Sequence, residues 1–131
     1  MTTWALLSAP VPSASAQPCR DVEVVFARGT DEPPGVGGIG QEFVDSMRSQ
    51  IHRRSVGVYA VNYPASTDFP RAADGVNDAA AHVQSMAANC PNTRMVLGGF
   101  SQGAAVIGFV AADVVPDGAP ASEVTGPMPP E

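Results

Sequence analysis

The chain contains the stretch Met95–Gly103, MVLGGFSQG, in which a short apolar run leads into a Gly-x-Ser-x-Gly pentapeptide. A predominantly apolar segment follows, from Gln102 to Val115. A strand, this pentapeptide and then a helix form the setting in which a serine sits on a sharp turn with its hydroxyl exposed. The stretch therefore predicts an α/β fold in which Ser101 is a nucleophile.

The residues around Ser101 suit that role. A tight strand-to-helix turn leaves no room for side chains at Gly99 and Gly103, and it directs the backbone N–H of Gln102 toward the oxygen that becomes negative during acyl transfer. The same pentapeptide arises by chance in chains rich in Gly and Ser, and Ser101 would then be an ordinary turn residue. The flanking strand and helix favour the nucleophile.

A serine nucleophile also needs a base that accepts its proton, and in this kind of site the acid and the histidine follow the serine in the chain. His52 and His82 both precede Ser101, and each is expected on the surface of a helix. Asp113 and Asp117 follow it, and both are expected to be solvated carboxylates. The base is therefore missing from its usual place.

Hydrophobic periodicity predicts alternating strands and helices. The predicted elements are strands over 22–27, 56–63 and 94–100 and helices over 41–54, 71–89 and 102–115. Arg53 and Arg54 are expected in the last turn of the first helix, where cations suit the helix dipole, and the apolar third helix is expected to be deeply buried. The alternation favours a parallel sheet with right-handed crossovers.

Three parallel strands make a small sheet with an open edge, and parallel sheets are normally covered on both faces. We therefore expect residues 19–115 to form part of a three-layer α/β domain that is incomplete at its C-terminal side. Residues 116–131 are rich in Pro, Gly, Ala and Ser, which predicts a loop or tail. A complete domain is expected to continue past Glu131.

The composition is that of a single globular domain, because 44% of the 131 residues are hydrophobic and 15% are charged. The net charge is −6, and the seven Lys and Arg residues are scattered along the sequence. No basic stripe is evident that would bind phosphate backbones or anionic headgroups. We therefore do not expect a nucleic-acid partner.

Residues 1–18 contain a short apolar segment at Trp4–Leu7 and a small-residue pattern at 14–16. The pattern is typical of a signal-peptidase site, although no basic residue precedes the apolar segment, so we expect an export signal that lacks its basic start. The alternative is a disordered Pro/Ser/Ala tail. Neither gives a membrane span, because the segment is short and interrupted by prolines.

Cys19 and Cys90 are the two cysteines of the chain. In an exported protein they would form one disulfide, which would close a loop of about 70 residues and stabilise the fold by about 4 kcal/mol in the chain-entropy model. In a reducing compartment they would be two unrelated buried thiols. The sequence by itself leaves both possibilities open.

Several further motifs occur together with the pentapeptide. They are Cys19, VVFARGT at 24–30, GGIG at 37–40, NYPA at 62–65, Cys90-Pro91 and GGFSQGAA at 98–105. In their order and spacing, over residues 19–120, the chain resembles the cutinase family, especially the cutinase-like proteins of mycobacteria and related actinobacteria. This agreement is far more specific than the pentapeptide alone.

The resemblance implies a secreted serine esterase of the α/β-hydrolase type, without metal or cofactor, that acts on esters of cutin, lipids or small acyl chains. Ser101 matches the family's nucleophile and Gln102 its first oxyanion donor. Thr30 matches the second donor through its backbone N–H, with its hydroxyl as a further candidate. Cys19 and Cys90 match the family's first disulfide.

The chain also departs from the family. A second cysteine pair that brackets the catalytic Asp, and a His in a later loop, are not present in the sequence. Loss of the base costs about 10⁶ in turnover in a comparable triad, so we expect a truncated enzyme that is weak or inactive. The alternatives are a non-catalytic secreted remnant, acting as a surface or antigenic protein, and a gene fragment.

The glycines at 35–40 also satisfy Gly-x-Gly-x-x-Gly, the fingerprint of a dinucleotide-binding oxidoreductase. Their distance from the preceding strand opposes that assignment, and so does the lack of an acidic residue at the end of the strand over 56–63. We expect these glycines to shape a loop beside the ester site.

Overall fold

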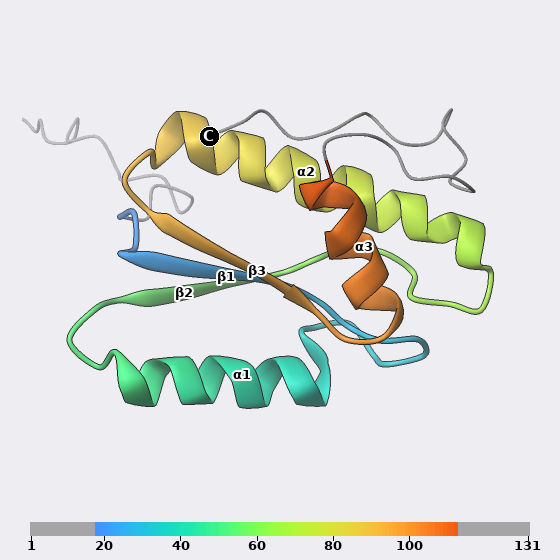
Figure 1. The fold of residues 1–131 in the computed structure, drawn as a ribbon, viewed down its shortest axis with the longest axis horizontal. Helices are drawn as coiled ribbons and strands as arrows, with labels where there is room; N and C mark the ends of the chain where they lie inside the picture. The colour runs from blue at the N-terminus through green and yellow to red at the C-terminus, as the bar shows by residue number, and fades with distance from the viewer. Residues whose placement is uncertain (1–17, 113–131) are drawn as a thin grey trace, which may run out of the picture.

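The computed structural model describes residues 18–112, which fold as a parallel sheet between two layers of helices (Figure 1). In chain order the elements are β1 (Val22–Ala27), α1 (Gly37–Gln50), β2 (Val56–Ala60), the 3-10 turn η2 (Phe69–Arg71), α2 (Ala72–Asn89), β3 (Arg94–Gly99) and α3 (Gln102–Ala111). α1 covers one face of the sheet, whereas α2 and α3 cover the other (Figure 1). The predicted three-layer α/β fold is confirmed. The predicted export signal, apart from Pro18, and the predicted tail lie outside the described residues.

β1 is the central strand, because the order across the sheet is β2–β1–β3. Val24 and Val25 point to opposite faces, and both are fully buried, since helices cover both sides of the sheet. In the register Val22 lies opposite both Val56 and Arg94, so the three strands begin at the same height. Burial on two faces explains the nearly continuous apolar run of this strand.

α1 begins at Gly37 rather than at Gln41, so the expectation that the glycines at 37–40 form a loop is wrong. The Glu32 carboxylate accepts a hydrogen bond from the Gly38 N–H at 3.1 Å. This carboxylate binds an N–H group of the first turn that has no partner within the helix, and its negative charge interacts favourably with the helix dipole. Both effects stabilise a helix start in a glycine-rich segment. It also occupies an N–H group that a dinucleotide phosphate would need.

α1 ends at Gln50, and the prediction that Arg53 and Arg54 occupy its last turn is wrong, because that turn contains Arg48. The backbone N–H of Arg54 donates to the carbonyl of Ile51 at 2.9 Å. This hydrogen bond closes a turn that leads the chain directly into β2.

β2 ends at Ala60, three residues before the predicted end at Tyr63. The backbone N–H of Asn62 donates to Asp78 Oδ2 on α2 at 2.8 Å, which takes the chain out of the sheet. The strands β1 and β3 and the helix α2 lie within one residue of their predicted bounds.

α3 is half buried, so the prediction of deep burial is wrong. Its buried side consists of Gly103, Val106, Ile107 and Val110. This side packs on α2 and on the sheet, whereas Ala104, Ala105, Gly108 and Ala111 are exposed. Within the described part of the chain, α3 therefore has one covered face and one open face.

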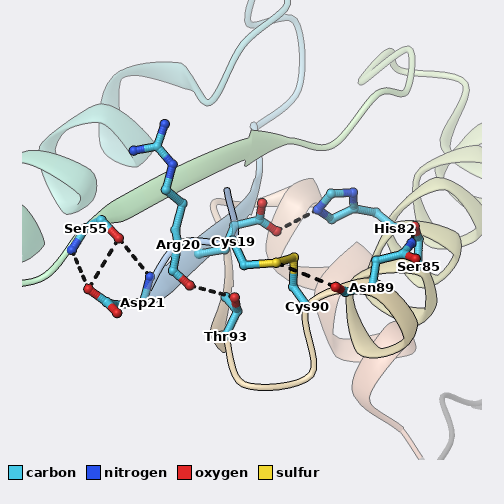
Figure 2. The surroundings of a disulfide bond; sticks show 10 residues. Cys19, Arg20, Asp21, Ser55, His82, Ser85, Asn89, Cys90 and Thr93 are labelled. Atoms are coloured by element: carbon cyan, nitrogen blue, oxygen red, sulfur yellow. Dashed lines mark hydrogen bonds and ion pairs between the residues drawn. A yellow bond between two sulfur atoms is a disulfide. The ribbon is translucent and has the colours of Figure 1, made fainter. Parts of the chain in front are cut away.

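A disulfide joins Cys19, ahead of β1, to Cys90 at the end of α2, with 5.6 Å between the Cα atoms. The predicted pairing is confirmed. Figure 2 shows that it is one of several links near the amino ends of the strands. Beside it, Thr93 Oγ1 donates to the carbonyl of Arg20 at 2.6 Å, and the Asp21 carboxylate binds the turn before β2.

Across residues 18–112, none of the helices combines the length and the apolar character that crossing a membrane requires.

Replacement of a central core valine should destabilise the fold far more than replacement of its cross-strand neighbour. Val24 is 0% exposed and pairs in register with Val58, which is 39% exposed. Val24→Ala is expected to lower the free energy of unfolding by about 2 kcal/mol, since it removes buried methyl groups and leaves a cavity. Val58→Ala serves as the control, with a loss below about half of that. Urea unfolding measures both, and equal losses would contradict the described core.

Candidate active site

Ser101 lies on the turn between β3 and α3, at the carboxyl end of the sheet. Its φ is 57° and its ψ is −121°, a conformation that L-residues rarely adopt and that costs on the order of 1–3 kcal/mol. The turn is held on both sides, because the Phe100 N–H donates to the Ala27 carbonyl at 3.1 Å and the Gly103 N–H donates to the Phe100 carbonyl at 2.8 Å. The exposed serine is thus fixed on a strained turn.

Two glycines make this turn possible. A Cβ atom at Gly99 would collide with the backbone carbonyl of Gly103, and a Cβ atom at Gly103 would collide with the carbonyl of Ala27. The first turn of α3 therefore lies against the end of β1, backbone to backbone. The strand, turn and helix that the pentapeptide predicts are present. Gly99 and Gly103 occupy the two positions at which neighbouring backbone segments leave no room for a side chain.

The side chain of Gln102 joins Ser101 to two loops. Its Nε2 donates to Thr30 Oγ1 at 2.9 Å and to the carbonyl of Ser66 at 3.0 Å. Because the Thr30 hydroxyl accepts this bond, its own proton remains available for another oxygen. The structure therefore brings together the predicted residues Thr30, Ser101 and Gln102. No sequence pattern predicts this side-chain hydrogen bond, because 72 residues separate its two partners.

A buried arginine supports the loop that carries Thr30. Arg28 is 5% exposed, and its guanidinium donates to the carbonyls of Glu32 at 2.6 Å, Tyr63 at 2.8 Å and Pro64 at 3.2 Å. In return the Tyr63 hydroxyl donates to the Arg28 carbonyl at 2.6 Å. Burial raises the pKa of Tyr63, so this hydroxyl keeps its proton at neutral pH. The role of Arg28 was not predicted from the sequence, although a charged residue directly after a mostly apolar, buried strand could have indicated it.

Glu32 closes the same loop from the outside. Its carboxylate accepts hydrogen bonds from the backbone N–H groups of Gly29 at 2.8 Å and Gly38 at 3.1 Å. These two bonds, chiefly the one from Gly29, hold the pKa of Glu32 below its ordinary value of 4.5. Nearby, the Asp31 N–H donates to the Ala65 carbonyl at 2.7 Å, and both residues have positive φ angles. The loops beside Ser101 are therefore tightly defined.

Neither histidine lies beside Ser101. His82 Nε2 is 2.6 Å from Glu23 Oε1, near the amino end of β1, and the ring stacks on Tyr59 with 3.6 Å between centroids. His52 is exposed in the turn after α1, also at the amino end of the sheet. His82 is more enclosed than predicted, with a side chain that is 19% exposed. Asp113 and Asp117 lie outside the described residues.

Apolar side chains are exposed close to the nucleophile. Phe100, directly before Ser101, is 44% exposed, and its ring lies against Gly29. Phe69, three residues after Ser66, is 58% exposed. These two side chains offer exposed apolar surface on the side of the sheet that carries Ser101.

Within residues 18–112 no group of three or more His, Cys, Asp and Glu side chains could hold a metal ion.

Comparison with known proteins gives one consistent result. The model of the cutinase family matches residues 18–126. Carboxylesterase Culp1 of Mycobacterium tuberculosis is 55% identical over 118 residues, which are 88% of this chain and 54% of that protein. Phospholipase Culp4 of the same organism is 56% identical over 128 residues, which are 98% of this chain and 54% of that protein.

Solved structures agree with the sequence comparison. A Trichoderma reesei cutinase in complex with a phosphonate inhibitor matches with a TM-score of 0.67 and 40% identity, over 84% of this chain and 51% of that one. An acetylxylan esterase matches with a TM-score of 0.66 and 28% identity, over 72% and 48%. The chain thus spans about half the length of the relatives it matches.

The backbone contact at Gly103 should contribute strongly to stability. Gly103→Ala is expected to destabilise the protein by about 3 kcal/mol, because the new methyl group would displace the end of β1. Gly108→Ala on the same helix meets no atom within 4 Å and should instead stabilise the protein by about 0.5–1 kcal/mol. Urea unfolding compares the two, and similar stabilities of the two variants would contradict the close approach.

Glu32 should make stability depend on pH in the acidic range. Because its folded pKa is depressed, its contribution is present above the unfolded value of 4.5 and is lost as the pH falls through the lower folded value. The difference in unfolding free energy between wild type and Glu32→Gln should therefore shrink from about pH 7 to about pH 3. Glu42→Gln, on the exposed side of α1, removes the same charge and serves as the matched control. A difference for Glu32→Gln that does not change with pH would refute the role of the two N–H groups.

Proposed function

The chain belongs to the cutinase family, and from this membership we propose that it supplies Ser101 as the nucleophile of a secreted carboxylic ester hydrolase that works through an acyl-serine intermediate. The observation that carries the proposal is the strained turn at Ser101, with the link from the following Gln102 to Thr30. Family membership and relatives with esterase names support ester hydrolysis in general.

The chemistry follows from what surrounds the serine. Ser101 Oγ attacks the ester carbonyl carbon as its proton passes to water, and the carbonyl oxygen becomes an oxyanion. The C–O bond to the alcohol then breaks as water returns a proton to the leaving oxygen. The backbone N–H groups of Gln102 and Thr30 are proposed to bind the oxyanion, with the Thr30 hydroxyl as a third donor. Removal of one such donor costs about 10²–10³ in turnover in comparable enzymes. Water then hydrolyses the acyl-serine.

The substrate proposed is an acyl ester or lipid with an apolar acyl chain. The exposed Phe100 and Phe69 side chains support this choice, because they offer apolar surface near the nucleophile. The relatives named above are a carboxylesterase and a phospholipase, which is consistent with ester bonds in lipids. Secretion is supported by the small-residue pattern at 14–16 and by the Cys19–Cys90 disulfide.

Turnover by this chain is proposed to be weak. Both histidines of the sequence lie at the amino end of the sheet, so neither can accept the proton of Ser101 in this arrangement. A serine in that state depends on substrate binding and on the oxyanion donors. The same observation favours a second candidate function, a non-catalytic secreted surface protein on a cutinase scaffold.

Labelling of the purified 131-residue chain with a fluorophosphonate, followed by intact mass, tests the nucleophile without assuming a substrate. We expect one phosphonyl group on Ser101, at a rate at least about 10³-fold below that of full-length Carboxylesterase Culp1, because the base is lacking. Ser101→Ala should remove the label. Ser49→Ala, at an exposed serine of α1, is the matched control and should leave the rate unchanged.

Each outcome decides between the proposals. Labelling that persists in Ser101→Ala would show that Ser101 is not the nucleophile. No labelling of a protein that is folded by circular dichroism would favour the non-catalytic surface protein. A rate equal to that of the full-length relative would contradict weak activation.

A further inference from the structure

The amino ends of the three strands carry most of the positive charge of this acidic chain. Five of its seven arginines gather there, namely Arg20, Arg48, Arg53, Arg54 and Arg94, and we call this surface the arginine end. The three strands begin in register, and neighbouring strands lie about 5 Å apart, so their starting points span about 10 Å across the sheet. Arginines that are distant in the sequence therefore lie on one surface. The arginine end is the side of Figure 1 on which the strand arrows begin.

The five arginines of the arginine end outnumber the carboxylates described at the same end of the sheet, Asp21 and Glu23. All five residues are exposed, and the ion pairs found within residues 18–112 are Arg71 with Asp74 and His82 with Glu23. The nearest acidic side chain along the sequence, Asp21, accepts hydrogen bonds from Ser55. Arg48 donates to the Val56 carbonyl, which carries no charge.

The opposite end of the sheet has the opposite sign. The loops and the first turn of α2 at the carboxyl ends of the strands contain Asp31, Glu32, Asp68 and Asp74. The arginines on that side are Arg28, which is buried among carbonyl groups, and Arg71, which is paired with Asp74. The described part of the chain is therefore polarised, with Ser101 at the acidic end and the arginine end about 20 Å away along β3.

We propose that the arginine end docks the protein on a membrane surface rich in anionic phospholipid headgroups, with Ser101 facing away from that surface. Guanidinium groups bind phosphate oxygens in a bidentate manner, and each basic residue near such a surface contributes about 1 kcal/mol. Five of them provide binding that is reversible and strongly dependent on salt, because the Debye length is about 10 Å at 0.1 M.

The shape of the surface favours headgroups over nucleic acid. The five arginines spread over the ends of three strands and one helix, rather than along a groove that could follow a phosphate backbone. Within the described residues, none of the large exposed apolar or aromatic side chains lies among them; these are Ile39, Phe43, Val58, Phe69 and Phe100. Among the described residues, His52 is the exposed ring at this end, so bases would find a single ring to stack on and lipid would find no apolar anchor.

The docked orientation has a consequence for the site. Ser101 would act on molecules that approach from the side opposite to the membrane, rather than on the lipids that hold the protein. The docking itself does not depend on the proposed hydrolysis, because it uses a different surface. A protein that proves inactive as an esterase can still bind through the arginine end.

Co-sedimentation of the full chain with lipid vesicles tests the proposal. Vesicles with about 30% phosphatidylserine in phosphatidylcholine should bind the protein at about 0.05 M salt at least about tenfold more strongly than pure phosphatidylcholine, with release at about 0.5 M salt. The variant Arg20→Gln, Arg53→Gln, Arg54→Gln, Arg94→Gln should lose binding. Arg48 is kept in this variant, since it also holds Val56.

Two single variants with the same net charge provide the matched control. Arg53→Gln should lower the partition coefficient about fivefold, whereas Arg71→Gln, at the acidic end, should leave it unchanged. Equal binding to both kinds of vesicle, equal losses in the two single variants, or tighter binding to duplex DNA than to vesicles would each overturn the proposal. Displacement by inorganic phosphate at constant ionic strength would also overturn it, because it would indicate a discrete phosphate site.

Discussion

The contact between the first turn of α3 and the end of β1 is the constraint on which the site depends. Gly103 lies against the Ala27 carbonyl so closely that no side chain fits, and the same carbonyl accepts the hydrogen bond from Phe100. This contact forces the chain to turn within two residues, and the positive φ of Ser101 follows from it. The strain at one residue is offset by packing of α3 and β3 against β1. An exposed hydroxyl is the result.

The loops around this turn are held by hydrogen bonds rather than by apolar packing. Arg28, at the end of β1, binds three carbonyls, and Gln102 connects the turn with Thr30 and Ser66. A buried guanidinium is costly unless its donors are satisfied, so the surrounding carbonyls must stay in place. Positioning of the proposed oxyanion donors thus arises from a polar network at the carboxyl end of the sheet, while the disulfide fastens the other end.

Much of this arrangement could be predicted from the sequence, and the failures have physical causes. The strand from Val22 to Ala27 was predicted to the residue, because burial on both faces leaves an unbroken apolar run. The start of α1 was missed, since the first turn is satisfied by the carboxylate of Glu32 in the preceding loop, and no sequence pattern marks this contact. The seven basic residues were predicted to be scattered, yet parallel strands bring five of them to one end. Pairings across the fold, such as Gln102 with Thr30, leave no local pattern.

A crystal structure of the chain after prolonged reaction with a fluorophosphonate tests the role of Ser101 most directly. We predict a phosphonyl group on Ser101, with Ser101 still at positive φ and the phosphonyl oxygen within hydrogen-bond distance of the backbone nitrogens of Gln102 and Thr30. A phosphonyl oxygen directed into solvent, or a Thr30 hydroxyl separated from the Gln102 side chain, would contradict it. Either finding would mean that the proposed oxyanion site is not built by this part of the chain.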